Sequence, residues 1–439
     1  MNLKALPLDG GGLGGGEHIR PHERASKVHP APNPSPSRGG ASRHHKFTSL
    51  RYREPMNSLG RIALPTDRAG LVPAPGEAVP VRAAIRAAAE AVEELADDWI
   101  ELAGRAAEPN AFAEHWFVAA ALKTVAPDRD LRLVEVRRGT RLIGLIIVET
   151  ATGYARLPVR IVRNWCHDQA FLGTPLVAAG EERAFWAAAI AALDAADRAP
   201  NLLHLRRLAE GGPVHRGLAG AAVVHRRHRA FLASELDPRA YYERAVRAKK
   251  RKELRRQRNR LAELGRLEAR LLEDRAELSA WCDAFLALEQ AGWKGRVGTA
   301  LAGAPAAGRF FREALAGAWD SGRLQFRRLD LDGRPIAMLV NFLTAPGSFS
   351  FKTAFDEGFA QYSPGVLIQL DNLAILDDPA IAWMDSCAAQ DHPMIDSLWT
   401  ERRSIVRATV RFTGARRIAI WALCRALELG SAALRGGKL

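Results

Sequence analysis

One histidine stands where it could move protons. His392 lies between Asp391 and Pro393, shortly after the apolar stretch at residues 381–387. Histidine titrates near neutral pH, so it can take a proton from an attacking amine or hydroxyl, and Asp391 can orient it or act in its place. The same residues also fit a helix start without chemistry, with Asp391 as the N-cap and Pro393 in the first turn. The sequence leaves both interpretations open.

Three further polar side chains stand at predicted strand ends. Asp385 lies near the end of the apolar stretch 381–387, and Lys352 and Asp356 flank the end of an alternating stretch at 348–354. Strand ends in open α/β sheets often border ligand crevices, so these residues are candidates for acceptor binding or proton handling. The alternative for Lys352 is an exposed ion pair, which contributes little to stability.

A short turn has the form of an anion cradle. Ser363, Pro364 and Gly365 precede an apolar run that begins with Val366 and Leu367. Serine can cap a helix, proline suits an early helical position, and glycine permits close approach of an anion to backbone amides. An ordinary helix start would use the same residues. We predict a cofactor-phosphate site over these five residues.

Trp293, Lys294 and Tyr362 are the candidate substrate-binding residues. Trp293 and Lys294 follow Gly292 at a predicted helix end, and Tyr362 precedes the turn at 363–365. A tryptophan can stack on a sugar or adenine ring, although covering the core is its commoner use. No Ser-His-Asp order, Cys-His nucleophile pattern or dinucleotide fingerprint occurs, and the four cysteines are scattered singly. The sequence therefore predicts no metal site.

The elements that must position these residues are expected in two similar series. The first comprises mainly helical structure at 81–122, a hairpin at 131–148, a strand at 159–165, a helix at 181–197 and strands at 202–205 and 222–232. The second comprises helices at 240–264 and 277–291, a hairpin at 324–342, a strand at 348–354, a helix at 366–376, a strand at 381–387, a helix at 392–403, a strand at 406–412 and a helix at 415–429. The shared order, at a spacing of about 190 residues, predicts a duplicated α/β domain.

Composition divides the chain further. Residues 1–55 are rich in Gly, Pro and His and lack apolar periodicity, which predicts a disordered tail and makes Met56 an alternative start. We expect a linker at 56–80, an N-terminal lobe at 81–235, a C-terminal lobe at 236–429 and a flexible end at 430–439. No apolar run is long enough to span a membrane, and no signal core is present. The sequence therefore predicts a soluble, cytoplasmic protein.

The charge is strongly basic and locally concentrated. With 63 Lys and Arg against 49 Asp and Glu, the formal net charge is +14. Ten basic residues with a single acid, Glu253, fall within 244–260: Arg244, Arg247, Lys249, Lys250, Arg251, Lys252, Arg255, Arg256, Arg258 and Arg260. This concentration of positive charge on a predicted helix indicates contact with an anionic polymer, cofactor phosphates or acidic lipid headgroups. No aromatic interleaving supports base stacking, and no DNA partner is expected. A solvated face is the alternative.

Several strings in the second half resemble one family. They are Gly292-Trp-Lys-Gly295, Gly298-Thr-Ala-Leu301, Asp332-Gly-Arg-Pro-Ile-Ala337, Phe351-Lys-Thr-Ala-Phe-Asp-Glu357, Tyr362-Ser-Pro-Gly365, Asp385-Ser-Cys387 and Asp391-His-Pro393. This set resembles the CelD-like acetyltransferases of the GNAT superfamily, which are associated with cellulose and exopolysaccharide biosynthesis. The resemblance covers about 240–425 well and the first half loosely.

The resemblance implies a fold and a reaction. The expected fold is α/β (α+β), with two tandem GNAT-like lobes, each a mixed, mostly antiparallel sheet flanked by helices. The expected reaction transfers an acyl group from acetyl-CoA or another acyl-CoA to an amine or hydroxyl of an envelope or exopolysaccharide precursor, without a metal. The turn at 363–365 departs from the superfamily's phosphate loop, Arg/Gln-x-x-Gly-x-Gly/Ala, because it has one glycine and neither Arg nor Gln three residues before it. This departure puts acetyl-CoA itself in question as the donor.

Two other functions fit the same features. An aminoacyl-tRNA-dependent peptidyltransferase-like enzyme would use the basic helix to hold tRNA. A catalytically inert GNAT-like scaffold would dock on a polysaccharide synthase, peripherally at the inner membrane.

Overall fold

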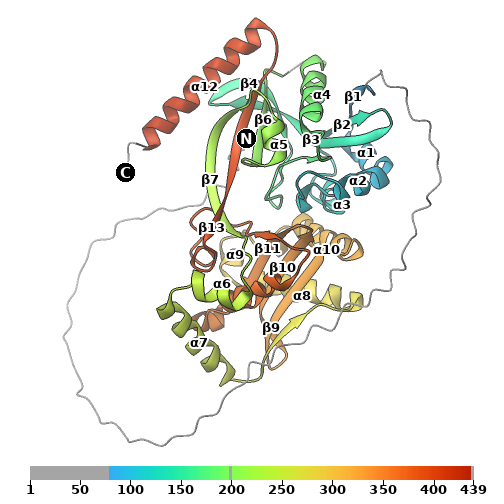
Figure 1. The fold of residues 1–439 in the computed structure, drawn as a ribbon. Helices are drawn as coiled ribbons and strands as arrows, with labels where there is room; N and C mark the ends of the chain where they lie inside the picture. Colours follow the sequence, from blue (N-terminus) through green and yellow to red (C-terminus); the bar gives the residue numbers. More distant parts are fainter. Residues whose placement is uncertain (1–78, 197–199, 437–439) are drawn as a thin grey trace, which may run out of the picture. The chain divides into compact units, whose positions relative to one another are not determined.

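The computed structural model describes residues 79–196 and 200–436 (Figure 1). Residues from Val79 onward form one compact unit. The predicted tail at 1–55 and nearly all of the predicted linker at 56–80 lie outside the described residues. At the other end, helix α12 (Ala415–Gly436) continues into the stretch for which a flexible end was expected.

Two series of elements follow one another along the chain. The first is β1 (Val81–Ala87), α1 (Ala88–Glu94), α2 (Ala96–Gly104), η1 (Ala111–Ala113), α3 (His115–Thr124), β2 (Arg132–Arg138), β3 (Arg141–Tyr154), β4 (Leu157–Asn164), β5 (Leu176–Val177), α4 (Glu182–Ala195), β6 (Leu202–Ala209), α5 (Pro213–Gly217) and β7 (Ala222–Leu232). The second is α6 (Pro238–Ala245), α7 (Ala248–Ala262), β8 (Leu267–Leu271), η2 (Arg275–Glu277), α8 (Leu278–Ala291), α9 (Trp293–Arg296), η3 (Leu301–Gly303), α10 (Pro305–Asp320), β9 (Leu324–Leu331), β10 (Arg334–Thr344), β11 (Gly347–Phe355), η4 (Glu357–Tyr362), α11 (Pro364–Asp371), η5 (Asn372–Asp377), β12 (Trp383–Asp385), η6 (Ile395–Ser397), β13 (Glu401–Arg411) and α12.

One sheet runs through both series, and its order is symmetric. The strands follow the path β1-β2-β3-β4-β6-β13-β7-β12-β11-β10-β9-β8, with β5 attached to β3. Each half contributes one parallel pair, β4 with β6 and β11 with β12, and the remaining pairs are antiparallel. The final strand of each half pairs with a strand of the opposite half: β13 pairs with β6, and β7 pairs with β12. The long strands β7 and β13 can be followed in Figure 1. The two halves have exchanged their final strands.

The predicted fold class is confirmed as α/β, with a mixed, mostly antiparallel sheet flanked by helices in each half. The halves also share a core. Phe112 and Phe117 of the first half pack edge-on against Phe342 of the second. Helix α3 packs on α10 so closely that a Cβ at Gly317 would lie 3.0 Å from the Cβ of Trp116. Strand pairing and core contacts both join residues before 235 to residues after 236. The two predicted lobes therefore share one sheet and part of one core.

Several predicted elements differ from the structure. Residues 81–87 form strand β1 rather than helix, and the short strand β8 and the long helix α10 were not predicted. The single helix predicted at 240–264 is broken, because Val246 is buried in an extended conformation between α6 and α7. Arg251 stabilises the break through Nη1, which donates to the carbonyls of Glu243 (2.6 Å) and Val246 (2.5 Å).

The helix predicted at 392–403 is wrong. Residues 395–397 form only a 3₁₀ turn, and β13 begins at Glu401. Leu398 and Trp399 are completely buried and anchor the turn, and the backbone from Glu401 onward pairs with β7. The strand predicted at 381–387 is similarly reduced to β12, at 383–385. Pairing with a distant strand therefore overrides local helix propensity here.

Candidate functional site

In the C-terminal half, two parallel strands separate early. β11 pairs with β12 only from Gly347 to Phe349, while β11 itself continues to Phe355. From Ser350 onward this edge of β11 has no neighbouring strand within the described part of the chain. An exposed strand edge offers backbone donors and acceptors to an extended ligand that carries amides of its own.

Helix α11 starts just beyond this free edge. Its N-cap, Ser363, has a left-handed φ of 54°, and its carbonyl accepts hydrogen bonds from the N–H groups of Val366 (2.9 Å) and Leu367 (3.1 Å). The first turn contains no acidic residue. The positive end of the helix dipole is therefore not neutralised locally, which favours an anion at this end.

The glycine of this turn has a packing role. Gly365 is buried, and a Cβ at this position would lie 2.9 Å from Cδ1 of Phe355 and 3.3 Å from Sδ of Met394. Pro364 and Leu367 are also buried. The missing side chain thus lets α11 approach the end of β11, and a larger residue would push against the protein rather than against a bound anion.

Lys352 projects from the free part of β11 without an ion-pair partner in the described ranges. Its Nζ lies 5.6 Å from the ring centre of Phe171, in the N-terminal half, and 5.7 Å from that of Phe351. Burial, reinforced by the charge of Lys294, lowers the pKa of Lys352 to about 8. The amine therefore exchanges its proton close to neutral pH, as a general acid or base requires.

Helix α9 is fixed beside the same strand. Lys294 forms an ion pair of 2.7 Å with the buried Glu289, which also accepts a hydrogen bond from the Leu301 N–H at 2.9 Å. Glu357, at the start of the β11–α11 connection, accepts from the Trp293 N–H at 2.5 Å and pairs with Arg296 at 2.6 Å. The Trp293 side chain is 52% exposed, so its indole is available to a ligand.

His392 lies close enough for Lys294 to influence it. Burial, with a smaller contribution from Lys294, lowers the pKa of His392, and its buried Nδ1 has no hydrogen-bond partner among the described residues. The imidazole is therefore neutral near pH 7 and can accept a proton. Asp391 is exposed at a left-handed φ of 58° and accepts only from Gln390 Nε2 at 3.3 Å. No helix begins here, so the capping interpretation of Asp391 and Pro393 fails.

The other predicted site residues make structural contacts. Asp385 is completely buried, and its carboxylate accepts from Arg229 (2.7 Å), Arg403 (3.1 Å) and the Cys387 N–H (2.9 Å). Burial alone would raise the pKa of Asp385, but the two arginines hold it below its usual value.

Asp356 and Tyr362 lie at the two ends of η4. Asp356 accepts from the Gly358 N–H at 2.8 Å and pairs with Arg334 at 2.6 Å. Tyr362 packs, partly buried, on an apolar cluster that includes Leu261 and Leu367.

The residues that the structure brings together around the free edge are therefore Lys352, Lys294 and His392, with the α11 turn beyond them. Two contributors were not predicted: Glu289 sits within an ordinary helical pattern, and Phe171 comes from the other half of the chain.

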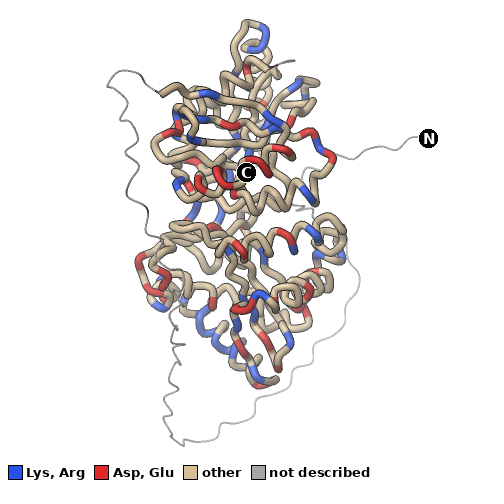
Figure 2. The backbone as a smooth tube through the Cα atoms, turned by 90° about the vertical axis from the view of Figure 1, so that its right-hand side faces the viewer, with Lys and Arg blue, Asp and Glu red and all other residues tan. Residues whose placement is uncertain are grey.

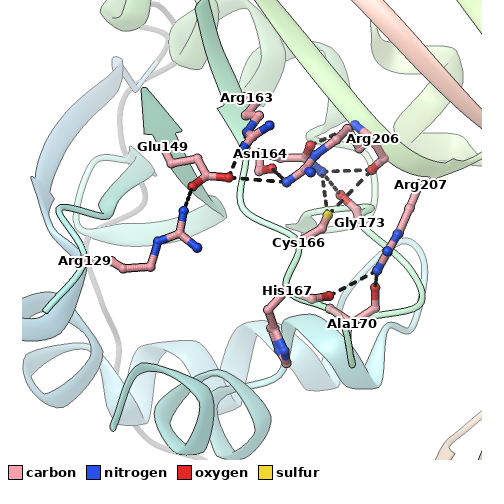
Figure 3. Close-up of polar contacts among 10 residues, drawn as sticks. All are labelled: Arg129, Glu149, Arg163, Asn164, Cys166, His167, Ala170, Gly173, Arg206 and Arg207. Atoms are coloured by element: carbon pink, nitrogen blue, oxygen red, sulfur yellow. Dashed lines mark hydrogen bonds and ion pairs between the residues drawn. The ribbon is translucent and has the colours of Figure 1, made fainter. Parts of the chain in front are cut away.

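At the corresponding place in the N-terminal half, the separated strands are bridged by hydrogen bonds. β4 and β6 also separate after a short parallel pairing, Val162 with Leu203 and Arg163 with His204. Here Asn164 spans the gap: its Nδ2 donates to the carbonyls of Gly173 (2.9 Å) and Arg206 (3.0 Å), and its Oδ1 accepts from the Arg206 N–H (2.8 Å) (Figure 3). A Cβ at Gly173 would lie 2.2 Å from the Arg206 carbonyl oxygen, so the loop packs directly against β6 at this point. A pocket adjoins this contact and is lined by Asn164, Gly173 and His167, among others.

Charge reinforces this difference between the halves. Helix α4 has Glu181 as its N-cap residue and Glu182 in its first turn, and Glu181 pairs with Arg138 at 2.6 Å. Beside the Asn164 bridge, the buried Glu149 is paired with Arg129, Arg163 and Arg206 (Figure 3). A helix that starts with carboxylates is a poor place for a second anion.

Comparison with known proteins gives the class. Residues 248–392 match the family model described as an acetyltransferase (GNAT) domain. That range includes β11, the α11 turn, Lys294, Lys352 and His392. This match supports an acyltransferase domain of the GNAT type in the C-terminal half. No curated protein matches the chain.

Solved structures of low similarity share parts of the fold. FemX has 9% identity and a TM-score of 0.48, with 76% of this chain and 92% of that chain covered. A tandem GNAT protein from the clavulanic acid biosynthesis pathway has 19% identity and a TM-score of 0.39, with 76% and 100% covered. A domain from Agrobacterium fabrum, described as the C-terminal part of a lysylphosphatidylglycerol synthetase, has 13% identity and a TM-score of 0.48, with 78% and 97% covered. At these identities and TM-scores, the likeness says nothing about the substrate of this protein.

Two further observations concern the described residues alone. No helix in 79–196 or 200–436 is both long and apolar enough to cross a bilayer. In the same part of the chain, no three His, Cys, Asp or Glu side chains are grouped so that they could hold a metal ion.

Proposed function

We propose that the protein is an acyl-CoA-dependent N- or O-acyltransferase whose donor binds along the free edge of β11, with its phosphates at the start of α11. The observation that carries this proposal is the open separation of β11 from β12 next to a helix start without acids, in the half where the GNAT match lies. The amides of the pantetheine arm can pair with the unpaired backbone of residues 350–355.

The cofactor's other groups have places nearby. The pyrophosphate would lie at Ser363 and the first turn of α11, where the dipole favours it. The exposed Trp293 can stack on the adenine or on a sugar ring. Acetyl-CoA is the simplest donor, and another acyl-CoA fits the same contacts.

Lys352 and His392 are the proton-handling residues of this proposal. An attacking amine or hydroxyl must lose a proton as it attacks the thioester carbonyl. His392 is neutral and has a free ring nitrogen, and Lys352 titrates near pH 8. Asp385 is excluded from this role because its carboxylate is already shared by two arginines.

The acceptor follows from the CelD-like resemblance: an amine or hydroxyl of an envelope or exopolysaccharide precursor, handled at the cytoplasmic face of the inner membrane. Helix α7 favours an anionic polymer or lipid as a second contact. Four of its basic side chains, Lys249, Lys252, Arg255 and Arg260, are exposed and have no ion-pair partner within the described residues. An aminoacyl-tRNA donor would use the same face.

The two halves supply a matched test of the donor site. Ser363→Asp would give α11 the acidic N-cap that α4 already has, and aspartate tolerates the left-handed conformation of this position. Calorimetric titration should show CoA affinity lowered at least 10-fold, while the melting temperature stays or rises because an acid at a helix start is favourable. Glu181→Gln, the control in the N-terminal half, should leave CoA affinity unchanged. Equal affinity in wild type and Ser363→Asp would contradict the assignment.

A further inference from the structure

The exchanged strands gather arginines on one face of the sheet. In the β7–β13 register, Arg229 pairs with Arg403, Arg227 with Ile405, and His225 with Arg407. Alternation places Arg227, Arg229, Arg403 and Arg407 on the same face as the buried Ile405. Ile405 belongs to the core that both halves share, so these arginines lie between the halves.

A fifth arginine is brought to this face by a strained bulge. Between the pairs Val406–Leu208 and Ala408–Leu205, both Arg206 and Arg207 oppose the single Arg407. Arg207 adopts a left-handed φ of 58°, a conformation that is unfavourable for a non-glycine residue and clusters at functional sites. Bulges re-aim side chains beside active sites. Arg206 turns to Glu149, and Arg207 turns to the loop at 167–171 (Figure 3).

Three of these five arginines have partners among the described residues, and two do not. Arg229 and Arg403 share Asp385, and Arg207 donates only to the carbonyls of His167 (3.1 Å) and Ala170. Within the described residues, neither the half-buried Arg227 nor the exposed Arg407 has a hydrogen bond or an ion pair.

The surroundings of Arg227 are electropositive. Burial, followed by the charges of Arg229, Arg207 and Arg407, lowers the pKa of Arg227 to about 10, and Asp385 opposes this shift only weakly. Like charges held together at a partly buried position destabilise the protein unless an anion neutralises them. Guanidinium groups bind phosphate oxygens in two-pronged fashion, so a phosphate is the anion that suits them.

The loop at 167–171 connects this cluster to the transfer site. Arg207 holds two of its carbonyls, and Arg229 donates to the Phe171 carbonyl at 2.9 Å. The ring of the same Phe171 lies 5.6 Å from Lys352 Nζ. A ligand anchored on the arginines therefore borders the loop whose other side contacts the proton-handling lysine.

We propose that Arg207, Arg227 and Arg407 bind a phosphate or diphosphate group on the acyl acceptor. This inference rests on the proposed function, and it narrows the acceptor to a phosphorylated compound such as a nucleotide-linked or lipid-linked saccharide precursor. The donor's phosphates are assigned separately, to the start of α11, so donor and acceptor anions have distinct places.

The test uses inorganic pyrophosphate as the probe and calorimetry on the full chain, with saturating CoA present. Pyrophosphate should bind the wild type with an affinity that falls as salt is added. Arg227→Gln and Arg407→Gln should each weaken it at least 10-fold, and Arg227→Lys less. The control Arg226→Gln alters the neighbouring residue on the opposite face of β7, paired with Glu210, and should bind like the wild type.

Each result decides something. No pyrophosphate binding, or equal binding by wild type and both glutamine variants, overturns the proposal. Loss of pyrophosphate binding when CoA is added also overturns it, because the arginines would then belong to the donor. The exposed Arg407 keeps the test valid if Arg227→Gln fails to fold. A protein that binds pyrophosphate through these arginines but never binds CoA would contradict the proposed function and support the anion site.

Discussion

The two halves share a strand order and differ in what occupies the place where their parallel strands separate. In the N-terminal half, Asn164 bridges the two strands by hydrogen bonds, and the loop containing Gly173 packs against β6 beside a pocket. In the C-terminal half, the edge of β11 stays free from Ser350 to Phe355. The helices that follow these strands also differ in charge at their starts: α4 starts with two glutamates, whereas α11 has no acidic residue in its first turn.

The comparison shows how a duplicated fold can divide its tasks. The N-terminal half satisfies its own strand edge and contributes Phe171, a core wall and arginines. The C-terminal half leaves backbone groups for a ligand to satisfy, as a cofactor site requires. The halves are structurally interdependent, because β7 and β13 are exchanged and Asp385 of one half neutralises Arg229 of the other. Figure 2 shows how closely the two signs of charge are interspersed along the backbone.

The largest effect is expected at this shared junction. Asp385→Ala would leave the charge of the buried Arg229 without a carboxylate to neutralise it, and removing one member of a buried ion pair costs about 3–5 kcal/mol of unfolding free energy. Urea denaturation measures the loss. Arg334→Ala, which removes the exposed partner of Asp356, should cost less than about 1 kcal/mol. Similar losses in both variants would contradict the role given to the junction.

Opening the N-terminal gap should weaken the fold and leave donor binding intact. Asn164→Ala removes two donated hydrogen bonds and one accepted bond at a buried position, which we expect to cost about 2–3 kcal/mol. CoA affinity, measured on the same samples below their melting temperature, should not change. A fall in CoA affinity would place the donor in the wrong half.

Lys352→Met should lower the activity without weakening the fold, the reverse of the effect expected for Asn164→Ala. Removing a proton-handling group typically lowers the rate of transfer by about 10²–10⁴-fold, and Lys352 has no ion pair in the described residues to lose. Stability at pH 7 should therefore hold or rise, because a buried charge is removed, while acyl transfer to an amine or hydroxyl acceptor falls. Thermal melting and steady-state kinetics test this together, and retained activity would remove Lys352 from the mechanism.

The lowered pKa of Lys352 should also make the stability of the protein depend on pH. Its pKa of about 8 lies below the ordinary lysine value of 10.5, so between these values the unfolded chain binds more protons than the folded one. The free energy of unfolding should therefore gain a contribution as pH rises from about 8 to 10.5. The difference between wild type and Lys352→Met across this window isolates the contribution, and a difference independent of pH would contradict the lowered pKa.

The smallest effect on the fold is expected at α7. Reversing Lys249, Lys252 and Arg255 to glutamate should change stability by less than about 0.5 kcal/mol per site, because their side chains are exposed. Binding to anionic vesicles or RNA at low salt should be lost, as it depends on these charges. Salt-insensitive binding in the wild type would instead support a solvated face.

Local signals in the sequence predicted much of the fold. Strands β7 and β9 fall at the predicted residues, and Asp332 and Gly333 take the positive φ values of 51° and 78° that a tight hairpin needs. The strand exchange could not be predicted, because β7 and β13 carry no local mark of which half they pair with. The same long-range pairing explains the failed helix at 392–403. For the candidate site, Lys352, Lys294 and His392 could be singled out from the sequence as candidates, whereas Glu289, Phe171 and the arginines proposed to bind an anion depend on contacts between distant segments.

The most direct test of the account is amide hydrogen exchange of the full chain with and without CoA. The unpaired edge of β11 at residues 350–355 and the start of α11 at 364–367 should gain protection when CoA is bound. The loop at 165–175 in the N-terminal half, already held by Asn164, should exchange equally in both samples. Protection confined to 165–175, with β11 unchanged, would contradict the claim that the C-terminal half alone holds the donor.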